Sequence, residues 1–352
     1  METKIIKIDE NEVTSEKLEE AGKIIRDGGL VAFATETVYG LGADALNKEA
    51  SKKIYKAKGR PSDNPLIVHI ADKSALSELA SSIDDKTNML AEAFWPGPLT
   101  MIVNKSSIVP YSITGGLETV AIRMPNHKVA LELIKASKRY IAAPSANTSG
   151  RPSTTKAEHV IEDLNGKIDM IIDSGAVKIG LESTIIDMTS KIPTILRPGY
   201  ITKEAIEDVI GEVLIDKAIT EGGMLSKDVV PKAPGMKYRH YAPKAMLTIV
   251  EGDEDKVLKY IEEKVNEHKK AGENVAVMAT DETLCKYSCD NVFSVGKRKE
   301  QTSIATHLFA QLRDFDEMNM EYIYSESFSR ENIGQAIMNR LMKAAGGNIV
   351  KL

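Results

Sequence analysis

The chain has few of the residues that build metal centres and disulfide frameworks. Its 352 residues include two cysteines, Cys285 and Cys289, one tryptophan and six scattered histidines. Two cysteines lack the second pair that a structural zinc site needs, and no His-Glu-x-x-His motif signals a catalytic zinc site. We therefore expect no dedicated metal site, and we expect the cysteines to be two ordinary thiols of a cytosolic protein.

Several other patterns are missing as well. No apolar run is long enough to cross a bilayer, and the first residues, Met1–Lys7, lack a signal-peptide pattern, which predicts a cytoplasmic protein without membrane contact. The P-loop, the Gly-x-Gly-x-x-Gly turn and the Gly-x-Ser-x-Gly elbow are also absent. A formal net charge of −5 argues against a globally basic nucleic-acid binder, although it leaves a local basic cleft open.

What is present is the composition of an ordinary soluble globular protein, with 42% hydrophobic and 28% charged residues. The length suggests two domains of about 150 residues each. Helix and strand patterns fail between residues 222 and 245, around the segment Lys232–Pro243. We therefore predict a first domain at 1–215, a linker at 216–245 and a second domain at 246–352.

The first domain is predicted to fold around a mixed α/β sheet, because short strands are separated by both helices and tight turns. Residues 35–42, Thr-Glu-Thr-Val-Tyr-Gly-Leu-Gly, are predicted to form a polar turn after the first strand. The predicted helices are 15–27, 48–58 and 86–94, and the predicted strands are 30–34, 66–70, 99–103, 119–123, 141–143, 170–173, 183–187 and 194–197.

The second domain shows a regular alternation of strands and helices. This alternation predicts a small parallel α/β domain of Rossmann-like topology. We expect Ala345-Gly-Gly347 to end its last helix. The predicted strands are 246–250, 274–279 and 322–325, and the predicted helices are 254–270, 303–316 and 331–345.

Two loops of the first domain carry the chemical signal. Lys56-Ala-Lys-Gly-Arg60-Pro-Ser-Asp-Asn64-Pro-Leu offers cations and an amide in a loop bounded by prolines. Ala143-Pro-Ser-Ala-Asn-Thr-Ser-Gly-Arg-Pro-Ser153 offers hydroxyl, amide and glycine residues. Fixed cations opposite a loop of this kind suit a polyphosphate. The two loops indicate a nucleotide enzyme that is not of the P-loop type.

Some of these side chains have an equally ordinary structural interpretation. Lys56, with its neighbours Lys52 and Lys53, fits a solvated helix face equally well. His69 fits a satisfied histidine of a buried strand, and Tyr39 fits a side chain that packs the turn. Arg60 is harder to dismiss, because Gly and Pro flank it and its planar fork suits phosphate.

The chain closely resembles the YrdC-like threonylcarbamoyl-AMP synthases, in the long form that carries an additional C-terminal domain. Each motif alone is weak, but their order along the chain is highly specific and covers nearly all of it. The matching segments are Thr35–Ala43, Lys58–Arg60, Asn64–His69, Trp95–Thr100, Ala121–Pro125, Ala143–Asn147, Glu182–Ile186 and Leu196–Gly199, followed by the linker Pro234–Pro243.

The resemblance implies a nucleotidyltransferase, an L-threonylcarbamoyladenylate synthase. L-threonine, bicarbonate and ATP give threonylcarbamoyl-AMP, pyrophosphate and water, and downstream tRNA threonylcarbamoyl-transfer proteins use the product to make N6-threonylcarbamoyladenosine. Such a transfer needs positioning and charge neutralisation more than a protein nucleophile. Mg²⁺ is expected on the phosphates of ATP, because no carboxylate cage is visible. A weak direct contact with tRNA is also compatible with this family.

The resemblance assigns roles to named residues. Arg123 is the expected clamp for the threonine carboxylate. The residues assigned to catalysis by positive charge are Lys56, Lys58 and Arg60. Those assigned to ATP are Arg60, Asn64, Thr119, Ser145, Asn147, Ser153, Arg197, His240 and Tyr241. Those assigned to L-threonine are Thr37, His69, Arg123, Ala143 and Ser183.

Alternatives remain open for the whole chain and for its second domain. An RNA-binding module would use the same basic cleft as a platform for RNA, and a carbamoyl transferase would pass the carbamoyl group to another acceptor. The second domain is either a stabilising appendage or, with the linker, a gate over the ATP site. The resemblance favours the gate.

Overall fold

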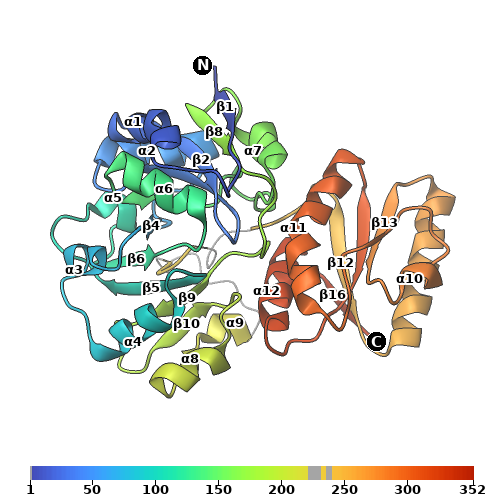
Figure 1. Cartoon of the computed structure of the whole chain (residues 1–352). Helices are drawn as coiled ribbons and strands as arrows, with labels where there is room; N and C mark the ends of the chain where they lie inside the picture. Colours follow the sequence, from blue (N-terminus) through green and yellow to red (C-terminus); the bar gives the residue numbers. More distant parts are fainter. Residues whose placement is uncertain (1, 221–230, 235–239) are drawn as a thin grey trace. The chain divides into compact units, whose positions relative to one another are not determined.

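The computed structural model describes residues 2–220, 231–234 and 240–352. The chain forms two compact units (Figure 1). The first comprises Met1–Ser149 and Ser153–Tyr238, and the second comprises Gly150–Pro152 and Arg239–Leu352. No sequence pattern indicated that the three residues Gly150–Pro152 group with the second unit. Part of the predicted linker, 216–245, lies outside the described residues, so its boundaries stay predictions.

The first unit is built on one mixed sheet of eleven strands, which confirms the predicted fold class. The strand order is β1-β8-β2-β3-β7-β4-β6-β5-β9-β10-β11, with parallel and antiparallel neighbours. The strands are β1 Lys4–Lys7, β2 Val31–Ala34, β3 Tyr39–Asp44, β4 Ile67–His69, β5 Leu99–Asn104, β6 Thr119–Arg123, β7 Ile141–Ala142, β8 Met170–Asp173, β9 Thr184–Asp187, β10 Thr194–Arg197 and β11 Leu214–Ile215.

The helices of this unit pack on both faces of the sheet, because alternate strand residues are apolar on each side. Several of these helices, among them α3 and α5–α9, were not predicted, since their apolar faces are short. The helices are α1 Glu19–Arg26, α2 Lys48–Lys58, α3 Ala75–Leu79, α4 Asp85–Phe94, α5 Tyr111–Thr114, α6 Lys128–Ser137, α7 Ala157–Leu164, α8 Lys203–Ile210 and α9 Lys217–Thr220, with a short 3₁₀ helix at Glu16–Leu18.

One face of the sheet is covered along most of its width. Residues such as Val68, Ile122 and Met101 point to this face, where helices α2, α4 and α7 contribute to the same core. The other face is covered by helices α1 and α6 over β2, β7 and β8. On β4, β6, β5, β9 and β10 the apolar side chains of that second face pack with Ala233 of the segment 231–234. In Figure 1, β6, β5 and β9 lie side by side in this part of the sheet.

The predicted polar turn at 35–42 is wrong in its second half. Strand β3 begins at Tyr39 and pairs antiparallel with β2, so only residues 35–38 form the turn. The glycines that suggested a turn are there because of close packing. A Cβ atom on Gly42 would lie 2.7 Å from the Phe33 ring and 2.8 Å from Ile141.

The second unit contains a five-stranded parallel sheet of order β14-β13-β15-β12-β16, as the alternation of strands and helices predicted. The edge strands β14 and β16 were not predicted, because each is only three residues long. The strands are β12 Met246–Glu251, β13 Val275–Ala279, β14 Val292–Ser294, β15 Tyr322–Glu326 and β16 Ile349–Lys351, and the helices are α10 Glu254–Ala271, α11 Gln301–Glu317 and α12 Gly334–Ala344, with a 3₁₀ helix at Leu284–Lys286.

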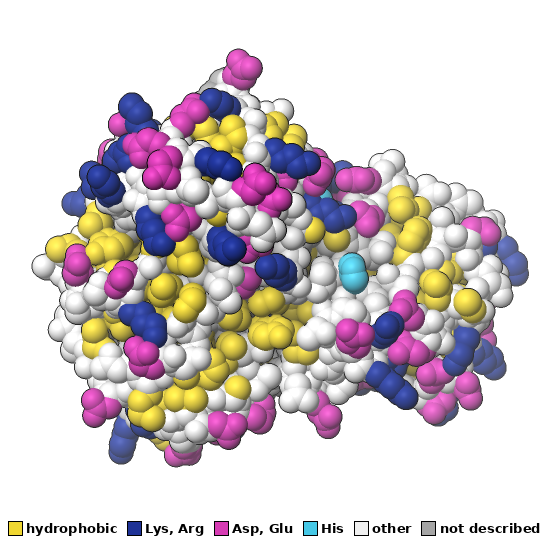
Figure 2. Space-filling view, in the orientation of Figure 1, with side chains coloured by type: hydrophobic (Ala, Val, Ile, Leu, Met, Phe, Trp, Pro, Cys, Tyr) yellow, Lys and Arg dark blue, Asp and Glu magenta, His cyan; other side chains and the backbone are white. Residues whose placement is uncertain are grey.

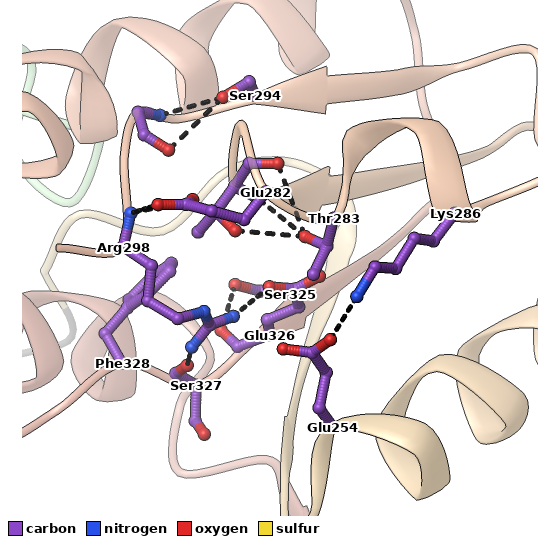
Figure 3. Close-up of polar contacts among 12 residues, drawn as sticks. Glu254, Glu282, Thr283, Lys286, Ser294, Arg298, Ser325, Glu326, Ser327 and Phe328 are labelled. Carbon is purple, nitrogen blue, oxygen red and sulfur yellow. Dashed lines mark hydrogen bonds and ion pairs between the residues drawn. The ribbon is translucent and has the colours of Figure 1, made fainter.

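Charged side chains near the carboxyl ends of this second sheet pair with one another (Figure 3). Arg298 forms an ion pair with the buried Glu326 and donates a 3.0 Å hydrogen bond to the carbonyl of Ser327. Tyr287 donates a 2.8 Å hydrogen bond to the same Glu326. Lys286 pairs with Glu254 of α10. This network therefore holds the ends of β12 and β15 and the loops around them together.

A search of the described residues for a helix long and apolar enough to cross a membrane found none.

Helix α2 leads into the predicted phosphate loop, and its first turn depends on one side chain. Asn47 accepts hydrogen bonds from the amides of Glu49 and Ala50, whereas the equivalent residue of α7, Lys156, makes no such bond. We expect Asn47→Ala to lower the free energy of unfolding by about 1 kcal/mol. Urea unfolding followed by circular dichroism measures this, and Lys156→Ala is the matched control. An equal loss in both variants would contradict the capping role of Asn47.

Candidate active site

His69 and Arg123 lie on the second face of the sheet, over strands whose apolar cluster on that face contains no residue of a described helix. His69 of β4 and Arg123 of β6 are paired neighbours in the strand register. They lie two residues beyond Ile67 and Ala121, which belong to the apolar cluster around Ala233. Because side chains alternate along a strand, His69 and Arg123 share the face of that cluster.

Arg123 is held on this face by two hydrogen bonds and one ion pair. Its Nη1 donates a 2.9 Å hydrogen bond to Oγ1 of Thr37, and its Nε donates a 3.3 Å hydrogen bond to the carbonyl of Gly97. Its Nη2 lies 2.6 Å from Oε2 of Glu36, and both side chains are buried. A buried guanidinium needs such partners to offset its desolvation. The structure thus brings together Thr37 and Arg123, two residues that were predicted to bind L-threonine.

The turn that carries Thr37 is fixed from two sides. Oγ1 of Thr35 lies 2.8 Å from Oγ1 of Thr37 and donates a 2.7 Å hydrogen bond to the carbonyl of Val38. The amide of Gly180 donates a 3.1 Å hydrogen bond to the carbonyl of Thr37. The side chains of this turn therefore have fixed positions above the sheet.

A second group of contacts joins Ser183, which was predicted to bind L-threonine, to Arg197, which was predicted to bind ATP. Arg197 donates 3.0 Å hydrogen bonds to the carbonyl and to Oγ of Ser183. Oγ of Ser183 also lies 2.7 Å from Oγ1 of Thr100. A β-bulge in β10 between Ile195 and Arg197 shifts the register there and sets the direction of the arginine.

The charge of Lys58 lies behind the Ser145 loop. The side chain is buried, and Nζ donates hydrogen bonds to the carbonyls of Ser145, at 2.6 Å, and of Asn147. Oγ of Ser145 in turn donates to Oδ1 of Asn147. Lys56, by contrast, is exposed at the end of α2. Lys58 therefore shapes the loop that was predicted to bind ATP, in addition to any field it supplies.

The loop before β4 turns two of the predicted ATP residues inward. Arg60 donates hydrogen bonds to the carbonyls of Asn64, at 3.4 Å, and of Pro65, at 3.0 Å. The side chain of Asn64 is buried, and among the described residues no donor is bonded to its Oδ1. Thr119 lies at the start of β6 and is half-buried.

Register places Thr119 and the pair His69 and Arg123 toward opposite ends of the same strands. β4 and β6 run parallel, so Thr119 lies on the side where β4 begins, near Arg60 and Asn64. His69 and Arg123 lie at the other end, about 13 Å from Thr119 along β6 at 3.3 Å per residue. The backbone of Ala143 joins the two ends, because its amide bonds to the carbonyl of Ile67 at 2.9 Å.

The residues of the loop 145–153 are divided between the two units. Ser153 donates a 2.6 Å hydrogen bond to Oε1 of Glu182 in the first unit. Gly150–Pro152 group with the second unit, where the fully buried Arg313 donates from Nε and Nη2 to the carbonyl of Pro152 at 3.1 and 2.7 Å. His240 and Tyr241 also belong to the second unit, and the Tyr241 ring lies 5.0 Å from the Phe309 ring.

His69 is neutral in this environment. Burial, together with the positive charge of Arg123, lowers the pKa of His69 to about 3, although hydrogen bonds to the backbone partly oppose this shift. Nδ1 lies 3.2 Å from the carbonyl of Ile67 and donates to it. Because the imidazole of His69 is neutral, the guanidinium of Arg123 supplies the positive charge at this end of β4 and β6.

Known proteins match this arrangement. The Sua5, yciO and yrdC family model, described as "Telomere recombination", matches residues 23–199, and the model "Threonylcarbamoyl-AMP synthase, C-terminal domain" matches residues 201–346. The threonylcarbamoyl-AMP synthase of Pyrococcus abyssi (strain GE5 / Orsay) is 51% identical over 96% of both chains, and that of Bacillus subtilis (strain 168) is 49% identical over 97% of both. The chain belongs to the threonylcarbamoyl-AMP synthase family.

The solved structures agree with this membership. The crystal structure of P. abyssi Sua5 complexed with L-threonine has a TM-score of 0.94 and 50% identity, covering 99% of this chain and 100% of that one. Both the fold class and the resemblance predicted from the motifs are therefore confirmed. The roles of individual residues stay predictions.

Sequence reasoning missed several residues of this threonylcarbamoyl-AMP synthase site. Glu36 and Thr35 are part of a quoted motif, but their contacts with Arg123 and Thr37 depend on how the turn folds. Thr100 is a strand residue whose partner, Ser183, is far away in sequence. His127 is buried near Glu36, and burial lowers its pKa although the carboxylates of Glu10 and Glu36 oppose the shift. No local pattern marks such a group.

The low pKa of His69 predicts a pH-dependent stability. The unfolded chain binds a proton at this histidine below about pH 6.5, while the folded chain does so only near pH 3, so stability is lost as the pH falls through that window. Between pH 6 and pH 5 we expect the wild type to lose about 1 kcal/mol more than His69→Gln. Urea unfolding at the two pH values measures this. Equal losses in the two proteins would contradict a neutral, buried His69.

Proposed function

We propose that the chain makes threonylcarbamoyl-AMP and pyrophosphate from L-threonine, bicarbonate and ATP on the open half of the first sheet. The observation that carries the proposal is the buried Arg123, which Thr37, Glu36 and Gly97 fix at one end of β4 and β6. The other end of these parallel strands holds the cationic and hydroxyl loops. This arrangement along the two strands suits a carboxylate at one end and a polyphosphate at the other.

The threonine end is assigned to the Arg123 group. Arg123 binds the carboxylate of the amino acid, and Thr37, His69, Ser183 and the backbone of Ala143 surround the rest. The P. abyssi Sua5 complex with L-threonine supports a threonine site in this family. The hydrogen bond between Arg197 and Ser183 supports a site in which the two substrates lie side by side, because Ser183 is assigned to L-threonine and Arg197 to ATP.

The ATP end is assigned to the two loops. Arg60, Asn64, Thr119, Ser145, Asn147, Ser153 and Arg197 bind the nucleotide, with Lys56 and Lys58 adding positive charge. His240 and Tyr241 of the second unit are kept as ATP residues on the resemblance alone. Burial of Lys58 behind the loop fits a role in holding carbonyls and amides toward the phosphates.

The chemistry follows from positioning and charge. The threonine amine and bicarbonate give a carbamate and water, and a carbamate oxygen then forms a bond to the α-phosphorus while the bond to pyrophosphate breaks. The nearby arginines neutralise the charge on the leaving pyrophosphate. Among the described residues no cluster of three His, Cys, Asp or Glu side chains fits a metal ion, so Mg²⁺ would be held by the ATP phosphates and water.

The segment 231–234 supports the gate hypothesis for the linker. Ala233 is fully buried among Ile67, Ala121 and Ile185, on the face that carries the site. Nζ of Lys232 lies 3.0 Å from Oδ2 of the buried Asp187. Burial alone would raise the pKa of Asp187, but hydrogen bonds from Thr189 and Lys232 outweigh it and lower the pKa. We propose that this ion pair fastens the linker over the substrates.

The two alternative functions, RNA binding and carbamoyl transfer to another acceptor, need different surfaces and residues. An RNA-binding platform needs a basic surface, but on the face drawn in Figure 2 acidic and basic side chains of the described residues are interspersed. Transfer of the carbamoyl group to another acceptor needs no threonine clamp. We propose that the product passes to tRNA threonylcarbamoyl-transfer proteins in the cytoplasm, with at most a weak direct contact to tRNA.

The central test of the reaction is threonine-dependent pyrophosphate release in the presence of ATP, Mg²⁺ and bicarbonate. We expect Arg60→Ala and Arg123→Lys each to lower kcat/KM by roughly 30- to 100-fold, because each loses a charge-assisted contact. Lysine is chosen at 123 because alanine would leave Glu36 buried without a cation. Arg139→Lys, which changes an arginine paired with Asp44, is the control. Wild-type release that does not depend on threonine would refute the proposed function.

The gate has its own test. Lys232→Ala removes the partner of Asp187, and we expect threonine-dependent turnover to fall roughly two- to fivefold while threonine-independent ATP hydrolysis rises. The control is Lys191→Ala, at an exposed lysine of the same unit. Assays of pyrophosphate and of AMP separate the two reactions. Identical behaviour of the two variants would remove the support that this ion pair gives to the gate.

A further inference from the structure

A buried carboxylate beside Arg123 has an oxygen without a donor. Glu36 lies in the turn between β2 and β3, and its side chain is 7% exposed. Oε2 lies 2.6 Å from Nη2 of Arg123 in an ion pair, but within residues 2–220, 231–234 and 240–352 neither carboxylate oxygen accepts a hydrogen bond, and the ion-pair contact is made by Oε2. Buried polar atoms in folded proteins are almost always hydrogen-bonded, and an unmatched one is costly. Oε1 is therefore an acceptor that a ligand is expected to satisfy.

The surroundings of Glu36 favour a positively charged or N–H donor. Arg123 is the cation that faces it directly, at 2.6 Å. The buried His127 lies close enough for the charge of Glu36 to raise its pKa, but burial has the larger effect and lowers the pKa of His127 overall. An anion bound next to Glu36 would be repelled by its carboxylate, while an ammonium group bound there would be attracted to it.

An α-amino acid fits this pair through both of its charged groups. Its ammonium and carboxylate are attached to the same carbon, and Glu36 and Arg123 present opposite charges at contact distance. We propose that Glu36 binds the amino nitrogen of the amino-acid substrate through Oε1, while Arg123 binds its carboxylate. This inference rests on the proposed function, because it takes the substrate of that site to be an amino acid.

The contact also suits the product of the first chemical step. The ammonium first loses one proton to solvent, the amine and bicarbonate then give a carbamate and water, and the nitrogen keeps one N–H bond. That N–H still donates to Oε1, so Glu36 holds the nitrogen in the same place before and after the carbamate forms. Fixing the nitrogen fixes the direction of the carbamate oxygen that attacks ATP.

Equilibrium binding to the full chain tests the proposal without relying on turnover. Calorimetry measures the Kd of L-threonine and of 3-hydroxybutanoate, which keeps the carboxylate and the hydroxyl group but lacks the amine. The wild type should prefer threonine by about tenfold or more, the size expected for one charge-assisted hydrogen bond. Glu36→Gln keeps the shape and a contact with Arg123, and should bring the two Kd values to within about threefold of each other.

Controls separate the possible outcomes. Asp163→Asn changes another buried carboxylate of the first unit, one that accepts from the amide of Thr148, and should keep the wild-type preference. Glu36→Asp keeps the charge and should retain part of the preference, which provides a second variant if Glu36→Gln does not fold. An unchanged preference in folded Glu36→Gln overturns the assignment of the amino nitrogen while leaving the proposed function standing. Failure of the wild type to bind threonine overturns both.

Discussion

The structure of the first unit depends on one buried guanidinium. Arg123 is the last residue of a central strand, and at this depth its charge is tolerated only because Glu36, Thr37 and Gly97 supply acceptors. Those acceptors come from a turn and a loop that are far away in sequence. Satisfying Arg123 therefore fixes the turn between β2 and β3, and the turn in turn brings Thr37 and Glu36 over the sheet.

The second constraint is that, among the described residues, α1 and α6 cover one part of the second face of the sheet and no helix joins the apolar cluster on the other part. Where α1 and α6 pack, alternate strand residues such as Val31 and Ile172 are apolar. Where they do not, the alternate positions become His69, Arg123 and Thr100, with Ala233 covering the apolar residues beside them. The same period-two pattern thus builds a core at one end of the sheet and, at the other, a polar surface that we propose binds the substrates. Within the first unit, Lys232 pairs with Asp187 and restrains the segment 231–234.

Much of this architecture was predictable, because strands and amphipathic helices carry local periodic signals. The parallel second sheet, the mixed first sheet and the loop at Ser145 all follow from such signals. What failed was the region where a glycine serves packing: Gly40 and Gly42 suggested a turn but belong to β3, and at Gly42 the side chains of Phe33 and Ile141 leave no room for a Cβ atom. The partners of Arg123, Ser183 and Arg313 were also out of reach, since long-range contacts depend on register and a bulge.

The account places the substrates on the open half of the first sheet, and methyl NMR tests that placement most directly. With isoleucine methyl groups labelled and assigned by Ile→Val substitutions, L-threonine should shift the signals of Ile67, Ile102 and Ile185, which share the face of Arg123. The signal of Ile172, under α1 and α6, and that of Ile249 in the second unit should stay in place. Shifts confined to Ile172 or Ile249 would contradict the account.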